Sequence, residues 1–107
     1  MRIALVTGAS RGIGLAVAIA LRARGMHVVR LARSLKNESA ERRTDIQCDV
    51  TKPDDVERAI DKIDTDLGVP DVLVNNAGIF FIKSLAETTL DDFTQTLAAN
   101  LTAPFLF

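Results

Sequence analysis

The 107-residue sequence contains no tyrosine and no tryptophan, and it has only one cysteine and one histidine. These counts exclude an internal disulfide and a metal site built from several cysteine or histidine ligands. We expect a structural role for His27, at the start of a predicted strand, and we predict no metal site. No apolar run reaches the roughly 18 residues of a membrane-spanning helix, and no signal-peptide pattern precedes the first strand. These absences favour a cytoplasmic protein.

The sequence also lacks an excess of either charge, since 13 Lys and Arg balance 14 Asp and Glu for a net charge of −1. Binding to nucleic acid or to an anionic membrane by bulk charge needs a positive excess. We therefore expect neither partner. Apolar residues make up 48% of the chain and charged residues 25%, which is typical of one globular domain with a modest core.

The most informative pattern lies in residues 3–14, where an apolar run, a glycine-rich turn and an apolar-periodic segment follow one another. The run from Ile3 to Val6 predicts a strand buried on both faces. Gly8 permits a sharp turn at its end, and Gly12 and Gly14 begin a helix. The unpaired N–H groups and the dipole of such a helix attract anions. The pattern predicts a diphosphate-binding turn, although a tight turn that binds nothing has the same glycines.

Three motifs together resemble the short-chain dehydrogenase/reductase family, most closely its 3-oxoacyl-carrier-protein reductase type. The segment Thr7-Gly8-Ala9-Ser10-Arg11-Gly12-Ile13-Gly14 is similar to the family's cofactor motif, and Asn75-Asn76-Ala77-Gly78 to its second signature. Asn100 stands where the family has a catalytic asparagine. The resemblance implies that the cofactor contacts Gly8, Ser10, Arg11, Gly12, Ile13 and Gly14, and that Asn76, Ala77 and Gly78 line its adenosine and ribose channel.

The family's proton donor is a tyrosine in a Tyr-x-x-x-Lys motif, preceded by a serine, several dozen residues beyond the asparagine. This chain contains no tyrosine. We therefore expect residues 1–107 to form a single NAD(P)-binding domain that is incomplete at its C-terminus and is catalytically inactive by itself. The complete enzyme would be an oxidoreductase that transfers hydride between nicotinamide and a small carbonyl or alcohol substrate, and a homo-oligomer. The alternative is a non-catalytic dinucleotide-binding or assembly module.

The residues after the second predicted strand, 27–32, indicate which cofactor is preferred. Arg33 lies 19 residues after Gly14 (33 − 14), where an NAD-type site would place a carboxylate for the ribose hydroxyls. No acid is present there, and a guanidinium suits a phosphate. We predict that Arg11, Arg33 and Ser34 bind a 2′-phosphate, so that NADP(H) is preferred to NAD(H). The alternative is that both arginines are solvated surface charges.

The middle of the chain continues the alternation of strands and helices. Residues 35–43 are predicted to be a loop with at most one helical turn, and residues 44–50 a third strand. Asp49 resembles the family aspartate beside the adenine ring, helped by the Val50 backbone, but it would equally cap the following turn. Thr51 is predicted to cap the next helix.

The end of the chain is predicted to form a fourth strand, over 71–74, and a final helix capped by Thr88 or Thr89. Pro104 should kink this helix or disturb its hydrogen bonds. Its apolar stripe is expected to pack on the sheet and consists of Phe93, Leu97, Leu101 and Phe105. Asn100 is either the catalytic asparagine that the resemblance implies, which organises water next to the catalytic lysine in a proton relay, or a solvated surface residue.

Four strands that alternate with helices predict an α/β fold, a Rossmann-type doubly wound parallel sheet. The expected strand order is third-second-first-fourth, with helices flanking the sheet. The cofactor should lie across the carboxyl ends of the strands, between the first and the fourth.

Overall fold

A computed structural model describes all residues from 1 to 107. The sheet strands are β1 (Ile3–Thr7), β2 (His27–Ala32), β3 (Glu38–Ala40), β4 (Arg43–Gln47) and β5 (Val72–Val74). The helices are α1 (Gly12–Ala23), α2 (Pro53–Asp66), α3 (Leu90–Leu97) and α4 (Ala103–Leu106), with a 3-10 turn at Leu85–Glu87 and a π-helical turn at Ala98–Thr102. No helix combines the length and the apolar character that crossing a bilayer requires.

The sheet order is β3-β4-β2-β1-β5, and its four parallel strands follow the predicted order third-second-first-fourth. The predicted doubly wound fold is therefore confirmed. The loop predicted for residues 35–43 is wrong in part, because β3 adds an antiparallel edge strand to β4. Arg42 has a left-handed backbone with φ of 56°, which reverses the chain between these two strands.

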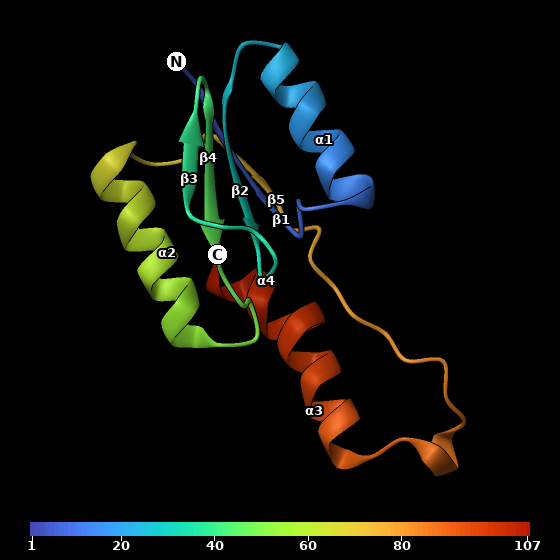
Figure 1. Ribbon diagram of the computed structural model, residues 1–107. Coiled ribbons are helices and arrows are strands. Elements are labelled where there is room, and N and C mark those ends of the chain that lie inside the picture. Colours follow the sequence, from blue (N-terminus) through green and yellow to red (C-terminus); the bar gives the residue numbers. More distant parts are fainter.

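The alternation of side chains along the strands builds two apolar layers, one on each face of the sheet. Leu5, Val29 and Leu31 lie on the face covered by α2 and α4. Val6 and Val28 lie on the other face, against α1. Figure 1 shows α1 and α2 on opposite sides of the sheet. Each fully buried side chain of this size contributes about 1.5–3 kcal/mol.

An ion pair occupies the α1 side of the sheet where β2 meets β4. The Arg30 guanidinium donates to both oxygens of Asp45, over 2.7 and 2.6 Å, and only 3% of Asp45 is exposed. This hydrogen bond raises the pKa of Arg30. The connection between β2 and β4 holds only the short strand β3 and no helix. A charged pair is therefore compatible with this edge, whereas a packed helix would have required apolar side chains there.

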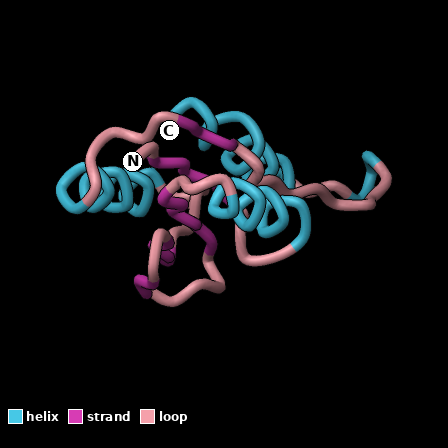
Figure 2. Tube along the Cα trace, turned by 90° about the horizontal axis from the view of Figure 1, so that it is seen from above, coloured by secondary structure: helices cyan, strands magenta, loops and turns pink.

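Residues 77–107, which we call the arm, extend away from residues 1–76, which we call the body. Figures 1 and 2 both show the loop before α3 projecting from the sheet, and the molecule measures 49 × 26 × 22 Å along its principal axes. Thr89 caps α3 in a capping box with Asp92, as predicted. Only the last turns of the arm return to the body, where Leu106 and Phe107 pack beside α2.

The apolar stripe of the arm does not pack on the sheet, so this prediction is wrong. Its four side chains are 40–86% exposed, whereas Ala99 and Ala103 are buried. Small alanines let a helix approach the body closely. The π-helical turn also inserts a residue between the two halves of the stripe, and Pro104 lacks the N–H that an α-helix would use at this point. The predicted disturbance at Pro104 is thus present as a π-helical turn.

Candidate functional site

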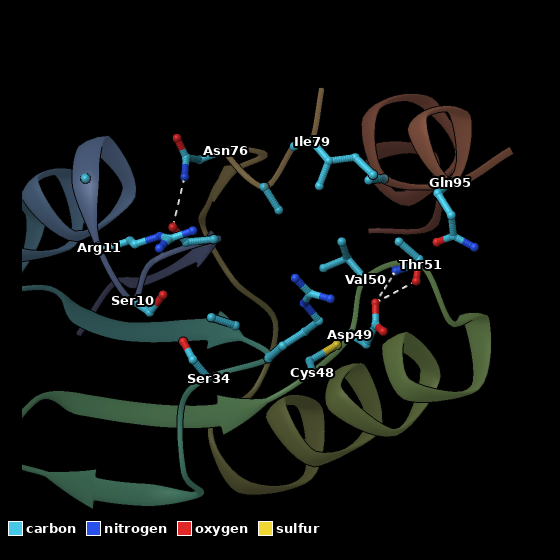
Figure 3. Close-up of a pocket in the computed structure, with 17 residues that line it drawn as sticks. Ser10, Arg11, Ser34, Cys48, Asp49, Val50, Thr51, Asn76, Ile79 and Gln95 are labelled. Atoms are coloured by element: carbon cyan, nitrogen blue, oxygen red, sulfur yellow. Dashed lines mark hydrogen bonds between the residues drawn. The ribbon is translucent and has the colours of Figure 1, made fainter. Parts of the chain in front are cut away.

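A cleft of about 690 Å³ lies at the carboxyl ends of the parallel strands. Its walls come from the β1–α1 turn and from the segments that follow β2, β4 and β5, and part of the arm closes one side (Figure 3). The cleft lies where the chain order reverses between β1 and β5. Open α/β sheets bind ligands at such a switch point.

Eleven of the thirteen residues predicted to bind the cofactor line this one cleft, although they come from four segments of the chain. They are Gly8, Ser10, Arg11, Gly12, Arg33, Ser34, Asp49, Val50, Asn76, Ala77 and Gly78. Ile13, Gly14 and Asn100 do not line it. Sequence reasoning missed six lining residues, which are Ala32, Cys48, Thr51, Ile79, Gln95 and Ala99.

The β1–α1 turn leaves its N–H groups without side-chain partners. Gly8 and Gly12 have positive φ of 63° and 60°, and a Cβ on Gly12 would meet no protein atom within 4 Å. The cap position of α1 is Arg11, which makes no capping hydrogen bond, and the first turn contains no acid. The positive end of α1 therefore faces open space that suits an anion.

Gly14 serves packing rather than the wall of the cleft. It is buried, and a Cβ at this position would collide with the Gly8 carbonyl oxygen and with the Asn76 amide nitrogen. The close approach of α1 to the turn therefore requires glycine here. Ile13, the other residue of the motif outside the cleft, has an exposed side chain.

Asn76 and Thr7 join the ends of β5 and β1. The Asn76 Nδ2 group donates to the carbonyls of Thr7 and Gly8, over 3.1 and 3.0 Å. The Thr7 hydroxyl oxygen accepts from the backbone N–H groups of Asn76 and Ala77, over 3.1 and 3.0 Å. This network holds the glycine turn against the loop after β5. Thr7 belongs to the motif, but nothing in a local pattern shows that its hydroxyl serves a strand 67 residues away.

Arg11 and Arg33 bring two positive charges to the cleft from different turns. Both side chains are exposed, and neither has an ion pair in the structure. Ser34, the residue after Arg33, also lines the cleft. The site therefore offers two guanidinium groups that a phosphate can engage without breaking an existing pair.

Asp49 closes the turn after β4 and keeps one carboxylate oxygen free. Its Oδ1 atom accepts from the Thr51 N–H and hydroxyl, over 3.0 and 2.6 Å (Figure 3). Burial raises the pKa of Asp49, but these hydrogen bonds and the charges of Arg33 and Lys52 outweigh it, so that its pKa is lowered. The predicted cap at Thr51 is wrong, because its hydroxyl serves Asp49 and α2 begins after Lys52 without a side-chain cap.

Asn100 connects the loop that follows β5 to the π-helical turn at Ala98–Thr102 by hydrogen bonds. Its Oδ1 atom accepts from the Ile79 N–H over 2.8 Å, and its Nδ2 group donates to the Ile79 carbonyl over 2.7 Å. Because Ile79 lines the cleft, Asn100 positions this wall from outside it. Asn100 also lies in the π-helical turn.

Cys48 lines the cleft, and only 1% of it is exposed. Burial raises the pKa of its thiol to about 11. The thiolate is the reactive form, so Cys48 is a packing residue at neutral pH. Its place within the predicted third strand, 44–50, gave no signal of a position in the cleft, but the observed strand β4 ends at Gln47, just before it.

The sequence matches the family model described as short chain dehydrogenase over residues 2–107. A short-chain dehydrogenase/reductase of Armillaria gallica is 39% identical over 98% of this chain and 44% of its own length. A 3-oxoacyl-[acyl-carrier-protein] reductase of Escherichia coli is 37% identical over 97% of this chain and 45% of its own length. The chain thus spans less than half the length of these relatives.

Solved structures show the same arrangement. The chain is 39% identical, with a TM-score of 0.84, to a short chain dehydrogenase of Burkholderia cenocepacia in complex with NADP, over 98% of this chain and 47% of that one. It is 27% identical, with a TM-score of 0.88, to 4-hydroxyisoleucine dehydrogenase complexed with NADH, over 99% of this chain and 46% of that one.

Proposed function

Because the chain belongs to the short-chain dehydrogenase/reductase family, we propose that it is the NADP(H)-binding part of an oxidoreductase. Residues 1–107 would form one dinucleotide-binding domain, incomplete at its C-terminus. The observation that carries the proposal is that one cleft brings together the N-terminal end of α1, which has no side-chain cap, and two arginines without ion pairs, Arg11 and Arg33. Related proteins of known structure are described as complexes with NADP, NADPH or NADH.

The residues of the cleft fit such a cofactor. The space beside Gly12, which a Cβ would enter, suits a pyrophosphate close to the backbone. Arg11, Arg33 and Ser34 would hold the 2′-phosphate, and the free oxygen of Asp49 would accept from the adenine amino group. Gly78 would let the cofactor pass close to the loop after β5.

The bound nicotinamide would supply hydride chemistry between the cofactor and a small carbonyl or alcohol substrate. We place the enzyme with the 3-oxoacyl-carrier-protein reductase type, on the similarity to such reductases. This chain has no tyrosine to protonate the substrate oxygen, so residues 1–107 alone should bind cofactor and show no turnover. Asn100 would position the loop beside the substrate through its two hydrogen bonds to Ile79.

Calorimetric titration of NADPH and NADH into the 107-residue protein tests the cofactor preference. We expect NADPH to bind at least about tenfold more tightly, because one charge-assisted pair to a phosphate is worth that factor. Arg33→Asp should abolish the preference. Arg24→Asp, an exposed arginine at the far end of α1, makes the same charge change and should not alter it. Equal affinity of the unchanged protein for both cofactors would refute the NADP assignment.

The second candidate is a non-catalytic binding or assembly module, and the exposed apolar side chains of the arm favour it. Another copy of the chain would cover them, and the open edge of β5 would be part of this contact. This candidate predicts a stable oligomer by sedimentation and no oxidation of NADPH with any carbonyl substrate, even after a Tyr-x-x-x-Lys segment is joined to the chain. Turnover in that longer chain would favour the enzyme.

A further inference from the structure

A second hollow, of about 510 Å³, adjoins the cofactor cleft at the outer end of β4, and no apolar residue lines it. Arg33 and Asp49 line both the hollow and the cleft, so the two spaces meet at this pair. The remaining wall includes Lys52, which precedes α2, and Asp55 and Arg58 near the beginning of α2. Nothing in the glycine motif or the asparagine motif points to this wall.

Hydrogen bonds hold the outer wall of the hollow in place. The Asn37 Oδ1 atom accepts from the Gln47 N–H over 2.9 Å, and the Gln47 Nε2 group donates to the Arg33 carbonyl over 3.3 Å. The short connection after β2 is thereby fastened to the end of β4. The backbone of Arg33 is consequently held in place before a ligand binds, which reduces the conformational entropy lost on binding.

The charges of the hollow are not all paired with one another. Arg58 pairs with Asp55, whose other oxygen accepts from the Asp49 N–H over 3.0 Å. Asp49 in turn is occupied by Thr51 through Oδ1. Arg33 and Lys52 have no ion pair, although both lie close enough to Asp49 to lower its pKa. One free cation, Arg33, therefore lies where the cleft and the hollow meet, and a second, Lys52, lies on the wall of the hollow.

We propose that Lys52 acts with Arg33 to bind the phosphate on the 2′-oxygen of the cofactor's adenosine, which makes Lys52 a residue that determines cofactor specificity. The inference rests on the proposed NADP(H) function. An ammonium group on a flexible stem binds phosphate as a point charge, beside the planar fork of a guanidinium. Lys52 would add a third positive charge to those of Arg11 and Arg33 around a group with close to two negative charges. The uncharged 2′-hydroxyl of NAD(H) would leave Lys52 without a partner.

The probe is 2′,5′-ADP, which carries the adenosine end of NADP without the nicotinamide half, and 5′-AMP is its counterpart without the 2′-phosphate. Calorimetry with the 107-residue protein should show that Lys52→Ala weakens 2′,5′-ADP binding about tenfold and leaves 5′-AMP binding unchanged. Lys52→Arg should keep most of the affinity. Lys62→Ala removes the same charge from α2 but lies outside the hollow, paired with Asp66, and should change neither affinity.

The remaining outcomes separate this inference from the proposed function. If Lys52→Ala leaves 2′,5′-ADP binding intact while Arg33→Ala weakens it, Lys52 is an ordinary surface lysine and only the NADP assignment stands. Equal losses for 2′,5′-ADP and 5′-AMP would also overturn the inference, because they indicate a general effect of charge. If the unchanged protein does not prefer 2′,5′-ADP to 5′-AMP, both proposals fail. Circular dichroism shows whether each variant is folded, and Lys52→Gln repeats the test if Lys52→Ala is not.

Discussion

The body and the arm both carry many large apolar side chains, but only the body buries them. Leu31, Val28 and Val29 in the body are 0–1% exposed, whereas Leu101 and Phe105 in the arm are 68% and 86% exposed. The buried residues of the arm are two alanines, Ala99 and Ala103. One chain therefore contains a region with its own core and a region whose apolar surface has no cover within the chain.

The reason for this difference lies in the sheet. In the body, every parallel strand has α1, α2 or α4 against one of its faces, and the turns between these elements are short. Beyond β5 the sheet has no further strand, so the arm has no sheet surface beneath α3. A helix buries an apolar stripe only where another layer receives it. Position in the sheet, rather than apolar content, decides which stripes are buried.

The largest effect should come from a matched pair of leucine truncations. Leu31→Ala removes a fully buried side chain and should lower the free energy of unfolding by about 3 kcal/mol. Leu101→Ala should change it by less than about 0.5 kcal/mol, because this side chain is exposed. Urea unfolding followed by circular dichroism measures both. Similar losses in the two variants would mean that the arm is packed in solution.

A smaller effect should come from the junction between the two regions. Thr7→Val keeps the shape of the side chain but leaves the N–H groups of Asn76 and Ala77 without their acceptor. We expect a loss of about 2 kcal/mol in the free energy of unfolding. Thr96→Val, which removes a hydroxyl that bonds within the arm helix, is the control and should cost less than about 0.5 kcal/mol. A neutral Thr7→Val would show that the junction does not depend on this hydroxyl.

The smallest effect concerns the start of α3. Hydrogen bonds from Lys83 and from the Thr89 N–H hold the pKa of Asp92 below its ordinary value of 3.8. A lowered pKa in the folded state stabilises the helix start above that value, and the stabilisation is lost as the pH falls through the lowered pKa. The protection of the Thr89 amide, expressed as the exchange rate relative to the intrinsic rate at each pH, should therefore fall in acid, while the protection of the strands of the body is unaffected.

Asp92→Asn should remove this pH dependence of amide exchange. Asp91→Asn takes a charge from the same turn without removing a hydrogen bond of the capping box, and should leave the dependence in place. If the Thr89 amide of the unchanged protein loses no protection in acid, the capping box does not hold the beginning of α3.

Much of the fold and of the site was predictable, because the signals for it are local. The apolar segment His27–Ala32 is a strand at its predicted bounds. The glycine spacing and the asparagine motif identify segments that parallel pairing brings to one edge of the sheet, and eleven predicted residues line one cleft there. Parallel strands align their carboxyl ends whatever their side chains are, so the order of elements along the chain was sufficient.

The misses depend on contacts or backbone shapes that no short pattern specifies. The strand β3 forms because Arg42 adopts a left-handed conformation that an arginine rarely takes. The Thr51 hydroxyl donates to Asp49 instead of capping α2. Both arrangements satisfy a hydroxyl equally well, so the local sequence did not distinguish between them. The four-residue repeat from Phe93 to Phe105 predicts a buried stripe, but the π-helical turn divides it.

By itself, the sequence determined the alternation of strands and helices, the glycine turn and the absence of a tyrosine, because composition and short-range periodicity act within a few residues of the chain. Only the tertiary structure decided that Thr7 and Asn76 join two strands, that Arg33 and Lys52 flank one hollow, and that the arm remains uncovered. These features arise where segments far apart in the sequence meet, and the geometry of the sheet sets which side chains face one another there.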